Sequence, residues 1–114
     1  MENDMVVDFL NDNLKVICLE SKKAIRILGP ESARKLQARY SDLKAVRGVS
    51  ELITGRPHPY KGKGEKRFSL DLSGGTHVLF VPTGDSPPRK VDGGIDWDAV
   101  TEVTIVFIGD NHDD

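Results

Sequence analysis

The sequence has a single cysteine, few aromatic residues and no long hydrophobic run. Cys18 has no second cysteine to pair with, so the class of small secreted domains held together by disulfides is excluded. Aromatic residues make up 6% of the chain, and the longest wholly apolar run, Ile105–Ile108, is far too short to span a bilayer. The first residues are acidic, unlike the basic start of a signal peptide. We therefore expect a cytoplasmic protein without a membrane segment.

The remaining composition is that of one ordinary globular domain. Of the 114 residues, 38% are hydrophobic and 30% are charged. The sequence contains no repeat, low-complexity tract or interdomain linker. Because a chain of this length buries roughly two-thirds of its unfolded surface in one core, we expect a single domain over residues 1–114.

The net charge of −2 is distributed unevenly along the chain. Residues 22–67 contain thirteen Lys or Arg against four Asp or Glu, whereas the segments on either side are acidic. Such an excess of positive charge attracts polyanions, of which nucleic acid is the obvious candidate. The alternative is that these charges only solvate two helices and a loop.

Apolar periodicity predicts two helices in the first half of the chain. From Asn11 or Asp12, either of which can cap a helix, apolar residues recur every three or four positions up to Gly29. Pro30 suits the first turn of a second helix, which ends near Gly48. The turn between them is short, so we expect an antiparallel helical hairpin.

Alternating residues predict a small sheet around this hairpin. Ser69 and Asp71 alternate with apolar residues, which indicates a strand with one face turned to water. The element order β-α-α-β-β-β describes an α+β domain in which the helical hairpin packs on a small antiparallel sheet. The expected strands are Met5–Leu10, Phe68–Leu72, Thr76–Val81 and Glu102–Ile108.

Five motifs accompany this order. They are HPYKG (His58–Gly62), FSLDL (Phe68–Leu72), HVLFVP (His77–Pro82), PPRKVDGGIDW (Pro87–Trp97) and VTIVFIGDNH (Val103–His112). Together they resemble the RelE/HigB-like toxins of bacterial type II toxin–antitoxin modules, which belong to the RelE/ParE superfamily. The resemblance spans nearly the whole chain, and the loop with the sequence DGGIDW is its most specific part.

The resemblance implies a RelE-like fold and an mRNA endoribonuclease that inhibits translation. Many such toxins need no metal or other cofactor and cut mRNA, often on the ribosome. Their partner is a cognate helix-turn-helix or ribbon-helix-helix antitoxin. The implied ligand is therefore mRNA, and no membrane is involved.

Cleavage of RNA through its own 2′-hydroxyl needs a base, an acid and a group that stabilises negative charge at phosphorus. His58 and His112 are imidazoles with an ordinary pKa near neutrality, and His77 opens a predicted strand. Asp110 is a candidate for orienting an imidazole. We therefore expect the catalytic residues among His58, His77, Asp110 and His112.

The expected phosphate ligands lie in the basic segment and at the C-terminus. Lysine and arginine bind phosphate, and arginine does so through two parallel hydrogen bonds. The metal-binding alternative, a tail with the sequence GDNHDD, lacks a rigid second element. The candidates for contact with RNA are Lys61, Lys63, Lys66, Arg67 and Asn111.

A three-stranded meander would bring these groups together only in part. The end of the last strand would lie beside the turn between the two before it, which places Asp110 near His77. The segment Arg56–Glu65 would enter at the other end of the sheet. Its ten residues reach up to roughly 33 Å when extended, so it can fold back and deliver His58 or Lys61 to the same site.

Each candidate also has a purely structural interpretation. His58 lies between two prolines and suits an exposed loop, His112 lies in the C-terminal tail, and His77 could simply line a sheet edge. Cys18 lies on the apolar stripe of a helix and is expected in the core. Trp97 is expected to anchor the long loop against the core rather than to stack on a base.

Two departures from the family pattern leave other functions open. Asn111 occupies the place of the usual tyrosine in an Asp-Tyr-His ending, and His77 that of a usual arginine. Asparagine does not titrate, and an ordinary histidine is mostly neutral at pH 7. The alternatives are a catalytically impaired relative that still binds its antitoxin, and perhaps RNA, and a gyrase-targeting toxin of the ParE type.

Overall fold

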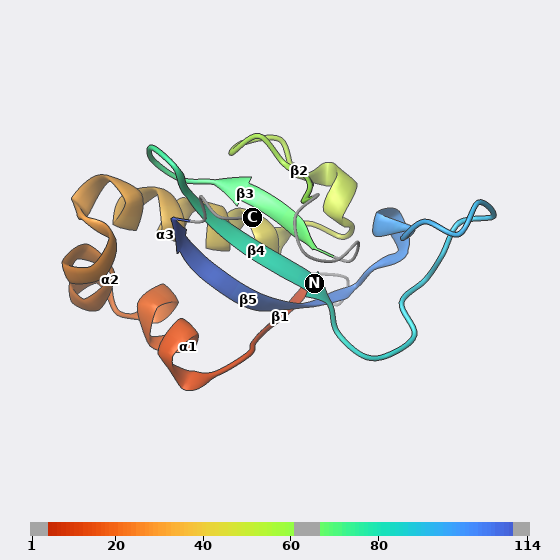
Figure 1. The fold of residues 1–114 in the computed structure, drawn as a ribbon, viewed down its shortest axis with the longest axis horizontal. Helices are drawn as coiled ribbons and strands as arrows, with labels where there is room; N and C mark the ends of the chain where they lie inside the picture. The colour runs from red at the N-terminus through yellow and green to blue at the C-terminus, as the bar shows by residue number, and fades with distance from the viewer. Residues whose placement is uncertain (1–4, 61–66, 111–114) are drawn as a thin grey trace.

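Figure 1 shows the fold in a computed structural model that describes residues 5–60 and 67–110, in which helices pack on one side of a five-stranded sheet. The predicted α+β class, with helices packed on a small sheet, is confirmed. In chain order the elements are β1 (Val6–Phe9), α1 (Asp12–Leu19), α2 (Ser21–Leu28), α3 (Pro30–Ala45), the 3-10 helix η1 (Val49–Glu51), β2 (His58–Pro59), β3 (Phe68–Asp71), β4 (Thr76–Pro82), the 3-10 helix η2 (Trp97–Ala99) and β5 (Glu102–Asp110).

The sheet is mixed rather than antiparallel throughout. Its strand order is β1-β5-β4-β3-β2, and β1 runs parallel to β5 while the other neighbours are antiparallel. The three helices that follow β1 lead the chain away from it, so its partner is the last strand, which is distant in sequence. The prediction of a wholly antiparallel sheet was wrong in this respect. The alternation of apolar and polar residues along a strand does not specify the direction of the neighbouring strand.

The first predicted helix is two helices that meet at Glu20. The Asn11 side chain caps α1 by accepting a hydrogen bond of 3.0 Å from the backbone N–H of Leu14. Glu20 has an extended backbone (φ −114°, ψ 107°) and separates α1 from α2. Before this break, α1 packs on β1, β5 and α3, whereas after it α2 packs mainly on α3. The change of direction at Glu20 allows the two helices to make these different contacts. No local sequence pattern predicts it.

The predicted hairpin is the pair α2 and α3. Gly29 joins them in the left-handed region (φ 88°), and Pro30 begins α3 as expected. Proline lacks the backbone N–H that a first helical turn leaves unused, and glycine avoids the steric cost of a positive φ. These two residues specify the turn locally.

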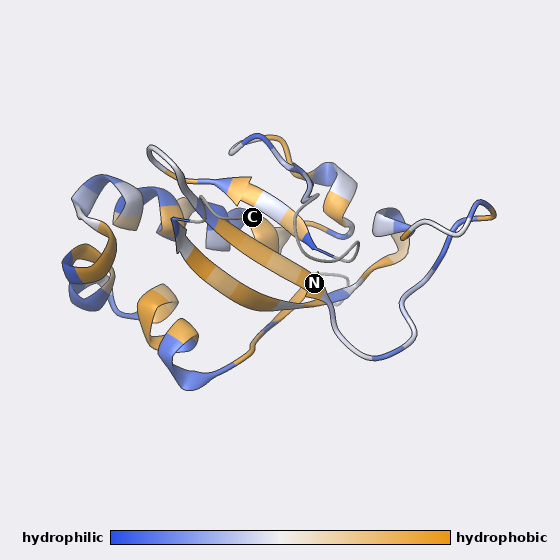
Figure 2. Cartoon of the chain, viewed as in Figure 1, coloured by the Kyte–Doolittle hydropathy of each residue, from blue (hydrophilic) through white to orange (hydrophobic). Residues whose placement is uncertain are grey.

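The core lies between the helices and one face of the sheet. Figure 2 shows that hydrophobic residues run along β4 and β5. The largest side chains with almost no solvent exposure on these strands include Phe80, Ile105 and Val103, and they pack with Leu36 and Leu43 of α3. Cys18 is buried in the same core, as predicted. Burial in this apolar environment raises the pKa of the Cys18 thiol to about 12.

The long loop after β4 projects from the sheet and is anchored at its end (Figure 1). Within it, the backbone N–H of Lys90 donates to the carbonyl of Gly94 at 2.8 Å, and Val91 at the tip is fully exposed. The Trp97 ring lies edge-on to Phe68, with ring centroids 4.9 Å apart. Trp97 therefore anchors the loop to the core, which confirms its predicted role.

Candidate functional site

Several polar side chains lie on the sheet face opposite the helices. Successive residues of a strand point to opposite faces, and Val78 and Phe80 belong to the core on the helix side. Across the strands, Ser69 is paired with His58, and Asp71 is paired with His77. Directly paired residues point to the same face, so these four share the outer face.

Asp71 binds two positively chargeable groups on this face. One carboxylate oxygen, Oδ2, accepts a hydrogen bond from Nε of Arg56 at 2.8 Å. The other, Oδ1, lies 3.2 Å from Nδ1 of His77. The Arg56 side chain is 76% exposed, so this ion pair contributes at most about 1 kcal/mol to stability. Its main consequence is to fix the positions of both partners.

The backbone at Gly55 and Arg56 is bent so that the arginine reaches Asp71. Both residues have a positive φ, 89° and 49°, and Arg56 is the only non-glycine residue with a positive φ in the described part of the chain. The carbonyl of Gly55 accepts a hydrogen bond of 2.6 Å from the Asp71 N–H. An arginine in this region costs roughly 1–2 kcal/mol, so the bend needs such contacts to hold it.

His58 lies in a strand and not in an exposed loop, which was the alternative expected from its flanking prolines. It forms the two-residue β2 with Pro59, and its Nδ1 donates a hydrogen bond of 2.6 Å to the carbonyl of Arg56. The side chain is half-buried. The chain has thus folded back along β3, as the length of the basic segment allowed, and it delivers His58 to the outer face.

Nδ1 donates a hydrogen bond in both imidazoles. A backbone carbonyl and an ionised carboxylate can only accept hydrogen bonds, so Nδ1 carries the proton in both His58 and His77. Nε2 of neither ring has a hydrogen-bond partner among the described residues. From the strand spacing, their Cα atoms lie roughly 12 Å apart. On the same face between them, Ser69 and Leu79 are buried.

The other predicted site residues are distributed as follows. Asp110 ends β5 opposite Thr76, so its backbone lies next to the pair formed by His77 and Gly109, as predicted. Its side chain shares the face of Thr76, however, and not the outer face to which His77 belongs. Arg67 precedes β3 at the end of the strand away from Asp71, where its carbonyl accepts from the Tyr60 N–H at 2.9 Å. The predicted residues outside the described part of the chain are Lys61, Lys63, Lys66, Asn111 and His112.

Ser69 corrects one sequence expectation about the outer face. It is 1% exposed, and its hydroxyl has no hydrogen-bond partner among the described residues. The prediction that it faces water was wrong. A buried hydroxyl that makes no hydrogen bond costs about 1–3 kcal/mol.

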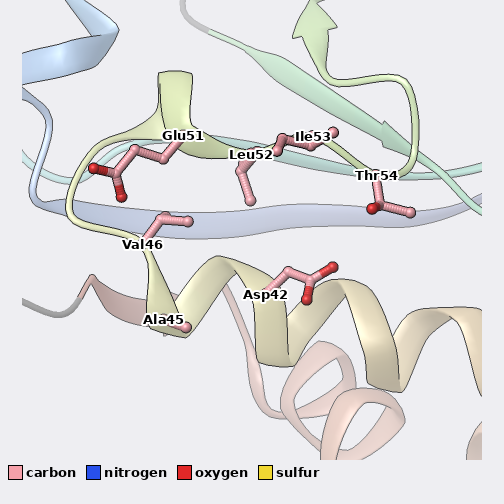
Figure 3. Close-up of a pocket in the computed structure, with 7 residues that line it drawn as sticks. All are labelled: Asp42, Ala45, Val46, Glu51, Leu52, Ile53 and Thr54. Atoms are coloured by element: carbon pink, nitrogen blue, oxygen red, sulfur yellow. The ribbon is translucent and has the colours of Figure 1, made fainter.

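A separate pocket of about 240 Å³ lies between the end of α3 and the segment after it (Figure 3). Asp42 and Glu51 contribute its carboxylates. Asp42 lies within 3.5 Å of Nε of Arg39, and Glu51 accepts a hydrogen bond of 2.9 Å from the Arg47 N–H. Both acids therefore already have partners. Over residues 5–60 and 67–110, no group of three or more His, Cys, Asp or Glu is placed to hold a metal ion.

Sequence reasoning missed Arg56 and Asp71. Asp71 had a usable signal, because the turn at Ser73–Gly75 pairs it with His77 in the hairpin. Arg56 had none, since it is 15 residues from its partner.

No protein-family model, curated protein or solved structure matches this chain. The resemblance to RelE/HigB-like toxins therefore stays a prediction from sequence motifs. No described helix is both long and apolar enough to cross a membrane.

Proposed function

We propose that this chain is a RelE/HigB-like toxin that cleaves mRNA in the cytoplasm without a metal and so inhibits translation. The observation that supports the proposal best is the pair of imidazoles on the outer face, each with Nδ1 hydrogen-bonded and with Nε2 unpartnered among the described residues. Proton transfer at two points is what cleavage through the 2′-hydroxyl requires. Arg56 lies in the same network and supplies positive charge.

In the proposed reaction, the 2′-oxygen attacks phosphorus while the bond from phosphorus to the 5′-oxygen breaks. His77, oriented by Asp71, accepts the 2′-hydroxyl proton at Nε2. His58, entering in its protonated form, gives a proton to the departing 5′-oxygen. Arg56 donates its remaining N–H groups to the phosphate oxygens. The products are a 2′,3′-cyclic phosphate and a free 5′-hydroxyl, so water enters no step of the cleavage.

The test is cleavage of an end-labelled RNA by the purified protein in the presence of EDTA. We expect His77→Gln and His58→Gln each to slow cleavage by a factor of 10² or more, and the product to carry a cyclic phosphate. Lys22→Gln, an exposed change on α2, is the matched control and leaves the rate unchanged. Equal rates in the two histidine variants and the wild type would contradict the assignment.

The same samples separate the alternative functions. A protein that binds an antitoxin of the helix-turn-helix or ribbon-helix-helix class but leaves RNA intact, on and off the ribosome, is the catalytically impaired relative. The replacement of the usual arginine by His77 favours that alternative, because a neutral ring supplies no fixed positive charge. Broken DNA with intact mRNA in expressing cells would identify a gyrase-targeting toxin.

A further inference from the structure

A cleft of about 440 Å³ adjoins the site at the end of the sheet. One wall is α3, and the other is the bend at Thr54–Arg56 together with the end of β3. The β3–β4 turn is tied to α3 nearby, because the backbone N–H of Ser73 donates to the hydroxyl of Ser32 at 3.2 Å. The residues that line the cleft are Arg34, Lys35, Ala38, Arg39, Thr54, Gly55, Arg56, Asp71 and Leu72.

The charge of this lining is strongly positive. Four of its side chains are Lys or Arg, and Asp71 is the only acid among them. Asp71 is already balanced by Arg56 at 2.8 Å and contacted by His77 at 3.2 Å. Arg34 and Lys35 project from consecutive positions of α3, and Arg34 is exposed. Arg56 is paired with Asp71 and Arg39 with Asp42, so the positive charge that an entering anion meets without an acidic partner in the lining is that of Arg34 and Lys35.

Arg39 has donor capacity that its neighbours do not use. Its side chain is only 13% exposed, and its Nε has no hydrogen-bond partner among the described residues, although it lies 3.5 Å from Asp42. Its stem packs against Gly55, where an added Cβ would lie 2.7 Å from Cδ of Arg39. A largely covered guanidinium whose Nε lies near a carboxylate without forming a hydrogen bond can donate to a ligand rich in acceptor oxygens.

Arg56 connects the cleft to the candidate site. It lines the cleft and also pairs with Asp71, which binds His77 on the outer face. No aromatic ring lines the cleft in the described part of the chain, so stacking of bases, the usual basis of single-strand binding by aromatic side chains, has no platform here. The chemistry fits phosphates along a strand rather than bases.

We propose that this cleft binds the phosphate backbone of the RNA strand that flanks the linkage held at the outer face. The inference rests on the proposed function in taking RNA as the ligand. It adds a second contact region, formed by Arg34, Lys35 and Arg39, that holds the strand without reading its sequence. Binding should therefore depend on strand length and salt but not on base identity.

The test measures fluorescence anisotropy of 2′-O-methyl RNAs of 4 and 12 nucleotides, which cannot be cut. We expect the wild type to bind the 12-mer at least tenfold more tightly than the 4-mer, and equally for adenine and uracil strands. In Arg34→Gln/Lys35→Gln, the 12-mer should no longer bind more tightly than the 4-mer. The slope of log affinity against log salt concentration should become shallower by about one to two. Lys22→Gln/Arg26→Gln removes the same two charge types from α2 and should change affinity less than twofold.

Other outcomes overturn the inference. Equal losses in the two double variants would show a general charge effect, and no advantage for the 12-mer would remove the second contact region. Displacement of RNA by a 12-residue polyglutamate at equal concentration would identify a site for acidic polypeptides. Cleavage of unmodified 4-mer is measured separately. If Arg34→Gln/Lys35→Gln cuts the 4-mer normally and binds the 12-mer as tightly as the wild type does, RNA binding by the cleft is refuted and the proposed cleavage stands. If the wild type shows the length effect but cuts neither RNA, the proposed cleavage is refuted and RNA binding by the cleft stands.

Discussion

Nδ1 of His77 lies 3.2 Å from Oδ1 of Asp71, across the hairpin that joins β3 and β4. The same carboxylate accepts Nε of Arg56 through its other oxygen at 2.8 Å. Asp71 therefore orients the imidazole that transfers a proton in the proposed reaction, and it also holds the arginine that lines the neighbouring cleft. Changes at this one residue should therefore affect both the proton transfer at His77 and the position of Arg56.

Asp71→Asn should slow RNA cleavage by a factor of 10² or more. His77 and Arg56 contact different oxygens of the carboxylate, and in the amide one of these positions is an NH₂ group that donates instead of accepting. One of the two contacts is therefore lost, together with the negative charge that orients the ring. Single-turnover rates at saturating RNA measure the effect. Asp85→Asn, an exposed change in the long loop, is the control. A rate for Asp71→Asn equal to that of the control would remove Asp71 from the mechanism.

Gly55→Ala should lower the free energy of unfolding by about 2–3 kcal/mol. The added Cβ would lie 2.7 Å from Cδ of Arg39 and 3.3 Å from the Asp71 carbonyl oxygen, in addition to the cost of a positive φ. Gly74→Ala is the matched control, because Gly74 also has a positive φ (59°) but nothing within 4 Å. Its cost should be about 1 kcal/mol. Urea unfolding measures both, and equal losses would mean that the contact with Arg39 is unimportant.

Trp97→Ala should lower the free energy of unfolding by about 3 kcal/mol. The change removes the ring that packs edge-on to Phe68 and to Phe80, at centroid distances of 4.9 and 6.1 Å. Val91→Ala, at the fully exposed tip of the same loop, should change stability by less than 0.5 kcal/mol, the usual range for surface positions. Thermal unfolding followed by circular dichroism serves for both variants. A small effect at Trp97 would show that the loop is not anchored there.

The stability contribution of Cys18 should fall as the pH rises above 9. Burial raises the pKa of its thiol from 9.0 to about 12 in the folded chain. The unfolded chain therefore releases its proton first, and the folded state loses stability between these two values. At pH 10 the loss is about 1.4 kcal/mol relative to pH 8. The measurement is the unfolding free energy of the wild type minus that of Cys18→Ala at both pH values, and a difference independent of pH would contradict it.

Local chemistry explains which parts of the fold were predictable. The cap at Asn11, the turn at Gly29 and Pro30 and the strand pattern from Phe68 each depend on neighbours within a few residues. The meander register follows from its short turn, which is why the approach of Asp110 to His77 could be predicted. The expected β-α-α-β-β-β order was therefore close to the observed one.

Contacts between distant residues explain the rest. The break at Glu20 lets α1 pack on β1 and β5 as well as on α3, and the parallel pairing of β1 depends on the position of the last strand. The contact of Arg56 with Asp71 depends on a bend at a non-glycine residue with positive φ. No local pattern in the sequence specifies any of these three features.

The two prolines around His58 have a consequence for the exposed margin of the sheet. β2 is the outermost strand on its side, and Pro57 and Pro59 have no backbone N–H. A neighbouring molecule that tried to extend the sheet there would find hardly any donors to pair with. His58 therefore lies at a sheet edge that disfavours pairing with a strand of another molecule. The protein can expose this histidine near solvent with little risk of aggregation through the edge.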